Sequence, residues 1–410
     1  MCRVAPEYRR ADYGSLAPMN TATPVNSTLT PTAQPASEHP SDTAKKTVVV
    51  LFGGRSSEHA ISVVTAAGVI KALDKSKYDV IPIGITKHGQ WVIPDPDFIN
   101  ANLDSATLPE IVTASEGEVM LSLLDRNKSL REVWSDKPPT DLGQVDVVFP
   151  LLHGPFGEDG TLQGLLELAD VPYVGCGVIA SAVGMDKHYM KVVFEAAGLA
   201  VGPYEVVLAK EWQQDPAAVT ERISRLKFPL FVKPARAGSS IGITRITSLD
   251  ELPAAMEKAQ LNDPKVVVEQ GIEGREIECA VLGGRNDGPT RTSLPGEIVV
   301  DGAEFYDFES KYLGEGDVTL AIPAALPPSV IADVQKVAVK AFDALEGEGL
   351  ARVDVFVTPD NQVIVNEINT MPGFTPISMY PQMWAASGLA YPDLLDELIQ
   401  LALERPVGLR

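Results

Sequence analysis

The sequence predicts two architectures in one chain: an open α/β sheet in the first half and an α+β arrangement in the second. Between about residues 46 and 183, apolar runs of strand length alternate with helical patterns, and glycine-rich loops follow the runs. From about residue 184, apolar runs come in pairs separated by short turns, which is typical of antiparallel strands. With 410 residues, the chain is long enough for two or three domains.

The composition excludes several classes of function. The chain has 55 acidic and 34 basic residues, with a formal net charge of −21. Such a surface repels nucleic-acid phosphates, so we expect no nucleic-acid partner. The three cysteines show no paired spacing, which argues against a disulfide framework or a thiolate zinc site. No apolar run approaches the ~20 residues of a membrane span, and no signal peptide is visible. We therefore expect a cytoplasmic protein with no membrane partner.

Residues 1–45 form a segment of distinct composition. They are rich in Pro, Thr, Ser and Ala and poor in aliphatic residues, so they offer little apolar surface to bury. We expect a disordered tail that ends where the first apolar strand begins at Lys46.

The elements of the first half follow from the apolar runs and the residues that flank them. The run from Thr47 to Phe52 has strand length and ends in Gly53–Gly54. The next residues, Ser56–Ser57–Glu58, precede apolar residues at helical spacing, which predicts a helix with a serine cap. Further along, we expect a strand at 80–85, an irregular insertion at 95–142, a strand at 145–151, a glycine-rich loop at 153–160 and a helix from Leu162.

The second half is predicted to contain three strand pairs and a long helix. The pairs are 230–232 with 242–246, 266–269 with 276–282, and 352–357 with 362–369, and the helix spans 328–345. Antiparallel pairs with interspersed helices indicate an α+β region.

The last strand pair carries polar residues that indicate a metal site. Side chains alternate along a strand, so Arg352 and Asp354 share one face, as do Glu367 and Asn369. If residues 358–361 form the turn, residue 352 pairs with residue 367 and all four groups lie on the same face. Two carboxylates and an amide oxygen suit Mg²⁺ or Mn²⁺, which commonly bridges nucleotide phosphates. The alternative is a solvated face or an ion pair between Arg352 and a carboxylate.

A lysine followed by a flexible loop predicts phosphate binding. The strand that ends at Lys233 leads into residues 234–242, which are rich in Gly, Ala and Ser. Glycine lets the backbone approach phosphate oxygens, successive N–H groups can form an anion nest, and the lysine adds a positive charge. This loop joins two strands and lacks the Walker pattern. An ordinary hairpin loop is the alternative.

The segment from 266 to 278 is a candidate adenosine site. The backbone of its short linker could hydrogen-bond an adenine edge, and an acidic residue of the returning strand could bind the ribose hydroxyls. Acidic residues on the surface of a β-hairpin are the alternative.

One glycine motif indicates a different class of enzyme. Residues 175–180 match the pattern G-x-G-x-x-A of Rossmann-type oxidoreductases. That pattern also requires an acidic residue about 20 positions further on, at the end of the next strand. The candidate, Glu195, lies in a segment with a helical pattern, so the motif is a weak signal.

Five segments together resemble the D-alanine–D-alanine ligase family of the ATP-grasp superfamily. The resemblance runs from about Lys46 to the C-terminus, and the motifs occur in the order typical of that family. The segments are 53–59 (GGRSSEH), 153–160 (HGPFGEDG), 233–242, 305–312 (FYDFESKY) and 366–373 (NEINTMPG).

The resemblance implies a three-domain ATP-grasp ligase with an open α/β N-terminal (pre-ATP-grasp) domain. The implied division is an N-terminal substrate-binding domain at 46–183, a central lid domain at 184–265, and a C-terminal domain at 266–410 with the adenine, metal and acceptor sites. A homodimer is also implied.

The resemblance further implies roles for individual residues. The first D-alanine would be bound by Glu58 and His153, and the second by Ser378, the backbone near Met379, and Lys311. ATP would be held by Lys187, Lys233, Ser240, Glu269, Gln270, Gly271, Ile272, Glu276 and Lys311. Two Mg²⁺ or Mn²⁺ ions per subunit would be held by Asp354, Glu367 and Asn369. The oxyanion would be stabilised by Arg352 and Gly373, and Tyr312 would join Ser239 and Glu58 in a hydrogen-bonded chain. His59 is expected to pack rather than to act as a base.

The implied reaction is the ATP-dependent ligation of two D-alanines through D-alanyl phosphate, for peptidoglycan synthesis. Segments 238–240 and 311–322 are expected to close over the acyl phosphate and exclude water. A D-alanine–D-lactate ligase is the rival within the superfamily, and Tyr312 is expected to select the amine acceptor. A Rossmann-type oxidoreductase is the alternative from a different class.

Overall fold

The computed structural model describes residues 44–95, 97–98, 109–111, 117–122, 128–300 and 318–406. All the elements below belong to one unit, residues 45–410. The tail predicted at 1–45 lies outside the described residues except for its last two positions. Lys311 and Tyr312 also lie outside them, as does most of the segment 311–322.

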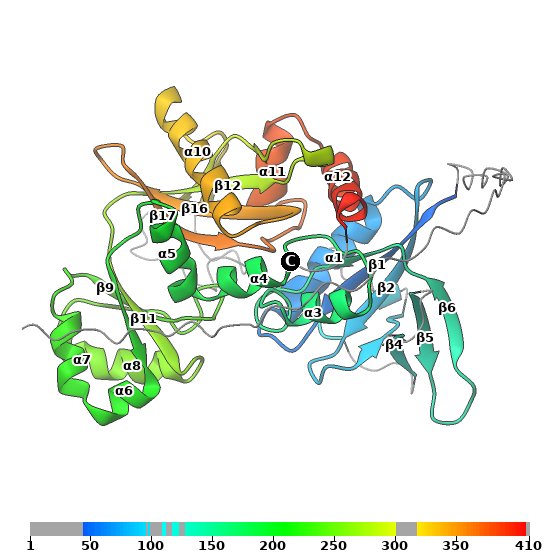
Figure 1. The fold of residues 1–410 in the computed structure, drawn as a ribbon, viewed down its shortest axis with the longest axis horizontal. Coiled ribbons are helices and arrows are strands. Elements are labelled where there is room, and N and C mark those ends of the chain that lie inside the picture. Colours follow the sequence, from blue (N-terminus) through cyan, green and yellow to red (C-terminus); the bar gives the residue numbers. More distant parts are fainter. Residues whose placement is uncertain are drawn as a thin grey trace, which may run out of the picture. The chain divides into compact units, whose positions relative to one another are not determined.

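The N-terminal sheet confirms the predicted open α/β region (Figure 1). Its order is β3-β2-β1-β7, where β1 (Lys46–Gly53) is parallel to β2 (Tyr78–Ile85) and to β7 (Val147–Pro150), and the short β3 (Trp91–Val92) is antiparallel at the edge. Strand β1 is buried from Val48 onwards, because its alternate residues pack into two apolar clusters, one on each face of the sheet. Helix α1 (His59–Ala72) connects β1 to β2.

The segment at 95–142 was expected to be irregular, and this prediction is wrong for its described part. Strands β4 (Glu118–Leu121), β5 (Ser129–Val133) and β6 (Thr140–Gln144) form a small antiparallel sheet in that order. Val119 and Leu130 are buried in the N-terminal core, whereas every residue of β6 is at least partly exposed. So short a sheet is anchored by few apolar residues, and its hydrophobic pattern is correspondingly weak.

Three helices follow β7: α3 (Thr161–Leu168), α4 (Val178–Met185) and α5 (Lys187–Ala196). Gly177 precedes α4, and Glu195 lies inside α5 rather than at the end of a strand. The acid that the dinucleotide pattern requires is therefore in the wrong place, and the oxidoreductase alternative has no structural support.

The central sheet has the order β10-β9-β11-β8 and is antiparallel throughout. Its strands are β8 (Tyr204–Leu208), β9 (Leu230–Pro234), β10 (Thr244–Ile246) and β11 (Lys265–Gln270). Helices α6 (Ala209–Gln214), α7 (Pro216–Ile223) and α8 (Leu252–Gln260) accompany it, together with a short 3-10 helix at Leu249–Glu251 (Figure 1). The predicted pairing of 230–232 with 242–246 is confirmed, since Val232 lies opposite Thr244.

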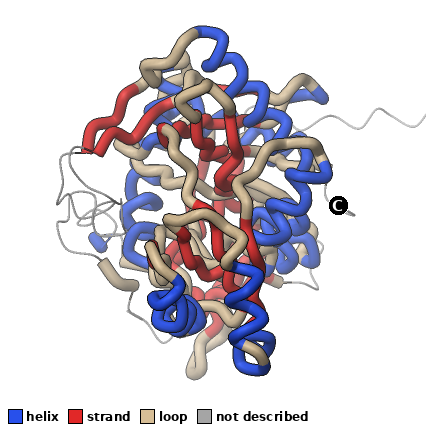
Figure 2. The backbone as a smooth tube through the Cα atoms, turned by 90° about the vertical axis from the view of Figure 1, so that its left-hand side faces the viewer, coloured by secondary structure: helices blue, strands red, loops and turns tan. Residues whose placement is uncertain are grey.

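The third sheet has the order β15-β14-β12-β16-β17, and β13 pairs with β12 beside this path. Its strands are β12 (Arg275–Leu282), β13 (Arg291–Thr292), β14 (Gly296–Val300), β15 (Val318–Ala321), β16 (Leu350–Val357) and β17 (Val363–Asn369). A short 3-10 helix (Arg285–Asp287) and helices α10 (Pro328–Ala344), α11 (Met379–Ala386) and α12 (Tyr391–Glu404) complete this part. Figure 2 shows helices on both flanks of the strands.

One predicted strand pair is wrong. The sequence suggested that 266–269 pairs with 276–282, but β11 pairs with β8 and β9 in the central sheet, whereas β12 pairs with β14 and β16 in the third. The linker between them crosses from one sheet to the other. Both strands are almost fully buried, so each needs a partner on both edges, and a simple hairpin could not supply them.

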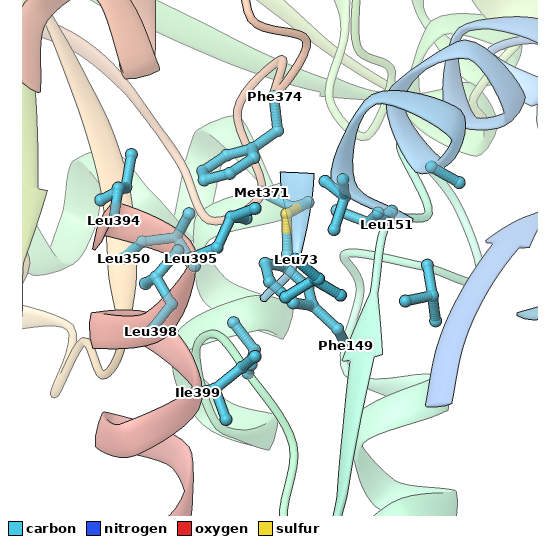
Figure 3. Packing of buried hydrophobic residues seen from close by; sticks show 14 of the residues in the cluster. Leu73, Phe149, Leu151, Leu350, Met371, Phe374, Leu394, Leu395, Leu398 and Ile399 are labelled. Carbon is cyan, nitrogen blue, oxygen red and sulfur yellow. The ribbon is translucent and has the colours of Figure 1, made fainter. Parts of the chain in front are cut away.

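The apolar core is divided into separate clusters. One cluster combines residues of β1, α1 and β7 with residues of β12, β16, α11 and α12 (Figure 3). Within it, Phe149 of β7 meets Phe374 edge-on, with the ring centroids 6.0 Å apart. A separate cluster, the central core, contains only residues between Val207 and Val268. None of the described helices is long and apolar enough to cross a membrane.

Candidate active site

A cavity of about 540 Å³ lies between the central and third sheets. Its wall includes β9 and the loop 237–240 on one side and β17 on the other, and the linker from β11 to β12 closes one end. Most of the residues predicted to bind ATP line this cavity: Lys187, Lys233, Ser240, Glu269, Gln270, Gly271, Ile272 and Glu276. Two of the predicted metal ligands, Glu367 and Asn369, line it too.

Three lysines line the cavity: Lys187, Lys191 and Lys233. Glu269 holds two of them: its carboxylate oxygens lie 2.7 Å from Lys233 Nζ and 3.2 Å from Lys191 Nζ. Burial raises the pKa of Glu269, but the two ammonium groups outweigh it and bring the pKa to about 2. Burial likewise lowers the pKa of Lys233, and the charge of Glu269 more than reverses this effect. Both groups are therefore charged at neutral pH.

Lys187 holds the loop after β9 by two hydrogen bonds, and two residues of this loop have left-handed backbone. Lys187 donates through its backbone N–H to Ala235 O and through Nζ to Ala237 O, both at 2.9 Å. Ser239 and Ser240 have φ values of +48° and +60°, a conformation that costs a non-glycine residue about 1–3 kcal/mol. Strained backbone of this kind is concentrated at functional sites, which favours a ligand loop over an ordinary hairpin loop.

The predicted metal face exists, although its register differs from the prediction. Asp354 lies opposite Glu367, and Arg352 opposite Asn369, instead of residue 352 opposite residue 367. Arg352 forks onto Asp354, with both N–O distances 2.7 Å, and Asn369 Nδ2 donates to Asp354 at 3.0 Å. The four predicted groups therefore meet on one face of the sheet.

Cations of the protein balance this acidic face. Lys187 Nζ lies 3.5 Å from Glu367, and Arg352 Nε lies 3.1 Å from Glu278 on the neighbouring strand β12. Burial lowers the pKa of Arg352, yet Asp354 and Glu278 hold it well above its usual range. The ion pair between Arg352 and a carboxylate, which was the alternative to a metal site, is thus present.

The same residues also fit a hard divalent cation. Within the described ranges, no group of three or more His, Cys, Asp or Glu side chains is placed to hold a metal. The predicted set has two carboxylates and an amide oxygen, which is the oxygen-only chemistry of a Mg²⁺ ion that shares its shell with phosphates. Glu367, Asn369 and the balancing Lys187 line the same cavity, so the set fits a nucleotide-borne metal.

The predicted donor site consists of Glu58 and His153, the residues expected to bind the first D-alanine. It lies where the first glycine turn meets the loop after β7. Glu58 is buried and accepts a hydrogen bond from Ser239 Oγ, which joins the N-terminal sheet to the glycine loop. The predicted serine cap of α1 is wrong, because Ser56 Oγ accepts from Glu58 N (3.2 Å) and donates to His153 O (2.7 Å) instead. Ser56 therefore holds the two loops of the donor site together.

His153 is buried in this site, and its ring contacts the turn that follows β17. Its Nδ1–H donates to Met371 O at 3.1 Å, so the proton is on Nδ1. Its Nε2 is buried without a partner among the described residues. Burial lowers the pKa of His153, which keeps the ring neutral and leaves Nε2 as a hydrogen-bond acceptor.

The predicted acceptor residues cluster at the start of α11. Ser378 caps this helix, and its Oγ accepts from Thr375 N at 3.1 Å. Gly373 approaches it closely, because a Cβ on Gly373 would lie 3.3 Å from Ser378 Oγ. Met379 is buried against Gly296, so its side chain packs and only its backbone is available for a ligand.

The linker that was predicted to bind adenine is anchored at two points. Gln270 N donates to Pro203 O at 2.9 Å, and Gly271 N donates to Pro229 O at 2.8 Å. The Gln270 side chain accepts from Lys227 N at 3.0 Å and is held by this hydrogen bond. Adenine recognition by this linker would therefore depend on its carbonyl oxygens and on the backbone of Ile272.

Sequence reasoning missed three charged residues of the site. Lys191 follows Lys187 by one helical turn, and Glu278 follows Glu276 on the same face of β12, so helical and strand periodicity could have found both. Glu158 belongs to the quoted motif 153–160 but received no role. Burial raises the pKa of Glu158 to about 8, and the nearby charge of Glu58 adds to the shift.

Comparisons with known proteins agree over most of the described residues. The family models "D-ala D-ala ligase N-terminus" and "D-ala D-ala ligase C-terminus" match residues 47–176 and 193–400. A D-alanine–D-alanine ligase of Pseudarthrobacter chlorophenolicus is 60% identical over 376 residues, which cover 91% of this chain and 98% of that protein.

Solved structures give the same result. The VanG D-Ala:D-Ser ligase of Enterococcus faecalis is 37% identical, with a TM-score of 0.75, over 88% of this chain and 100% of that one. The D-alanine–D-alanine ligase of Coxiella burnetii is 37% identical, with a TM-score of 0.72, over 88% and 94%.

The two antiparallel sheets that enclose a lysine- and acid-lined cavity, preceded by an open α/β sheet, define an ATP-grasp enzyme. Relatives at this level of identity and coverage narrow the class further. The chain belongs to the D-alanine–D-alanine ligase family.

Proposed function

We propose that this enzyme ligates two D-alanine molecules to D-alanyl-D-alanine, with ATP converted to ADP and phosphate, for peptidoglycan synthesis. The observation that carries the proposal is a cavity lined by three lysines and by Glu367 and Asn369 of the acidic face, with Glu58 beside it through the hydrogen bond from Ser239. Such a site can bind a nucleotide, an ammonium group and a carboxylate together, as a carboxylate-activating ligase requires.

Positioning and charge would drive the first step. Glu58 would bind the ammonium group of the first D-alanine, with His153 as a further acceptor, and so direct its carboxylate towards the γ-phosphate. Lys187, Lys233 and the backbone of Ser240 would neutralise the phosphates, and Glu276 would bind the ribose. Two Mg²⁺ or Mn²⁺ ions held by Asp354, Glu367 and Asn369 would supply further charge neutralisation when bound. The products of this step are D-alanyl phosphate and ADP.

The second step needs an oxyanion site and a dry cavity. The amine of the second D-alanine, its carboxylate held by Ser378 and the backbone near Met379, would lose a proton and attack the acyl carbon. Arg352 and the Gly373 N–H would stabilise the tetrahedral oxyanion, and phosphate would leave. We further propose that Lys311 assists the acceptor carboxylate and that the segment 311–322, with Tyr312, closes over the acyl phosphate.

The domain division belongs to the same proposal. We propose an N-terminal domain at 46–183, a central lid and a C-terminal catalytic domain, with the lid extended from residue 265 to Gln270 because β11 pairs within the central sheet. A homodimer and a cytoplasmic location complete the proposal.

The choice of acceptor is the point on which relatives differ. The likeness to a D-Ala:D-Ser ligase makes D-serine a second candidate acceptor, beside the D-lactate weighed from the sequence. The decisive experiment is an ADP-release assay with D-alanine alone, D-alanine plus D-lactate, D-alanine plus D-serine, and L-alanine, with the products identified by mass spectrometry. We expect D-alanyl-D-alanine as the main product. No ADP release with D-alanine would refute the proposal.

A further inference from the structure

Glu158 links two parts of the molecule that come from opposite ends of the chain. It lies in the loop between β7 and α3, and it lines the main cavity. Its Oε2 accepts the N–H of Gly154 at 2.5 Å, within its own loop. Its Oε1 accepts the N–H of Met371 at 3.1 Å, in the turn that follows β17.

The turn at Met371 is held on three sides by the N-terminal part. Its N–H is bound by Glu158, and its carbonyl oxygen accepts from His153 Nδ1 at 3.1 Å. Its side chain is buried in the cluster shared by β7 and α12 (Figure 3). Met371 is therefore a fixed point between the two parts, and Glu158 supplies one of its two polar contacts to the donor loop.

Residues of the proposed reaction lie near both N–H groups that Glu158 binds. At one end, Gly154 lies so close to the donor carboxylate that a Cβ on it would be 2.6 Å from Glu58 Oε2. At the other end, Met371 stands two residues after Asn369 and two residues before Gly373. A change in the length of the bridge must alter the separation between the donor site and the metal and oxyanion groups.

We propose that Glu158 is a positioning residue, whose carboxyl group sets the distance between the donor site and the Asn369–Gly373 turn by accepting both N–H groups at once. This inference rests on the proposed function. It assigns Glu158 no contact with substrate. Misplacing reacting groups by about 1 Å can cost about 100-fold in rate. A shorter side chain at residue 158 should therefore lower the rate.

The test compares two substitutions that separate the length of the side chain from its number of acceptor oxygens. Glu158→Asp keeps the carboxyl group but shortens the side chain by one methylene, so it cannot reach both N–H groups. Glu158→Gln keeps the length and one acceptor oxygen but replaces the other oxygen with an amide NH2 group. We expect Glu158→Asp to lower kcat/KM for the first D-alanine by about 30- to 100-fold, while KM for ATP stays within about twofold of wild type. Glu158→Gln should show a smaller loss.

Amide hydrogen exchange supplies a readout that does not depend on turnover. Exchange at the Gly154 and Met371 N–H groups should be about tenfold faster or more in Glu158→Asp than in wild type. The matched control is Glu167→Asp, because Glu167 is a carboxylate on α3 that accepts from Tyr173 Oη at 2.8 Å outside the cavity lining. This control should leave the two amides and kcat/KM unchanged.

Each outcome decides the question. Wild-type behaviour of Glu158→Asp in both readouts would overturn the proposal, and so would a larger loss in Glu158→Gln, since the identity of the second acceptor atom rather than the reach of the side chain would then matter. If Glu158→Asp does not fold, Glu158→Gln must still show faster exchange at Met371 and a raised KM for the first D-alanine. If the wild-type enzyme makes no dipeptide, the proposed function fails, whereas the exchange comparison still tests the bridge.

Discussion

A single neutral histidine secures the first glycine turn. His59 donates Nδ1–H to Gly54 O at 2.7 Å, and its Nε2 accepts the N–H of Ile111 at 3.0 Å. The turn is crowded, because a Cβ on Gly53 would lie 2.3 Å from Ile85 O. An imidazolium ring would place a second donor against the Ile111 N–H, so the folded state requires the neutral form. The contacts agree with the expected packing role of His59.

This arrangement makes stability depend on pH. Burial lowers the pKa of His59 in the folded state, so between the folded pKa and the unfolded value of about 6.5 the unfolded chain binds more protons. Stability therefore rises with pH through this window and falls on acidification, by at most about 1.4 kcal/mol per pH unit. Urea unfolding from pH 7.5 to 5 should show this loss. His59→Gln should be less stable at pH 7.5 but lack this part of the slope. An unchanged slope would exclude His59 as its source.

A substitution of Glu367 tests whether the acidic face binds metal. Glu367→Gln keeps the volume and removes one charge beside Lys187, so the phosphates of a bound nucleotide are less well neutralised. We expect turnover to fall by at least ~100-fold at saturating Mg²⁺, the usual value of one preorganised electrostatic group. The exposed Glu257 on α8 provides the control, because Glu257→Gln should leave turnover unchanged. Near-normal turnover of Glu367→Gln would contradict the metal assignment.

The β16–β17 pair was predicted from the sequence only in part. Alternation predicted the correct face, but two details of register were wrong. The loop has five residues, 358–362, because Val357 pairs with Val363, and a bulge adds one more residue after Val365. Each error alone would have turned Glu367 to the opposite face, and together they cancel. Bulges depend on local geometry that a hydrophobic pattern does not encode.

A buried ion pair behind the glycine loop positions helix α5. Asp186 caps this helix by accepting from His188 N and Tyr189 N, and it also pairs with Lys265 of β11. Both charged side chains are at most 10% exposed. The pair therefore ties the start of α5, which carries Lys187, to the central sheet.

Removing one member of this pair should cost more than removing both. Asp186→Asn keeps a cap but strands the Lys265 ammonium, and Lys265→Met strands the carboxylate, so each should cost about 3–5 kcal/mol of unfolding free energy. The double variant should cost clearly less than the sum, and a urea-unfolding cycle with all four proteins measures the coupling. Strictly additive losses would show that the two side chains stabilise the fold independently.

Across the molecule, the sequence predicted where strands and helices lie better than it predicted which strands pair with one another. The open N-terminal α/β sheet was predictable because β1 and β7 are apolar runs and a helical pattern follows β1 directly. The assignment of β11 and β12 to different sheets was not, because partner choice depends on contacts between distant segments. Glu158 was missed for the same reason, since its role appears only when Met371 is brought beside it.

The division of the apolar core predicts two levels of local stability. The central core contains only residues from 207 to 268, whereas the N- and C-terminal parts share one cluster. Leu230→Ala should destabilise the central sheet by about 2–5 kcal/mol, as measured by amide exchange, and leave β1 and α12 protected. Leu151→Ala, the matched change in the shared cluster, should speed exchange in both β1 and α12. Equal effects of Leu230→Ala on all three sheets would mean that the body unfolds as one unit.

The shared cluster also has a consequence for the nascent chain. Its last N-terminal member is Val174 and its last C-terminal member is Ala402, roughly 230 residues later. At ~5–20 residues per second, translation of that interval takes about 10–50 s. The central sheet has its complete core once Val268 has emerged and can fold while the ribosome continues. The first sheet must wait for α12 with the apolar side of β7 uncovered, so we expect ribosome-associated chaperones to bind there.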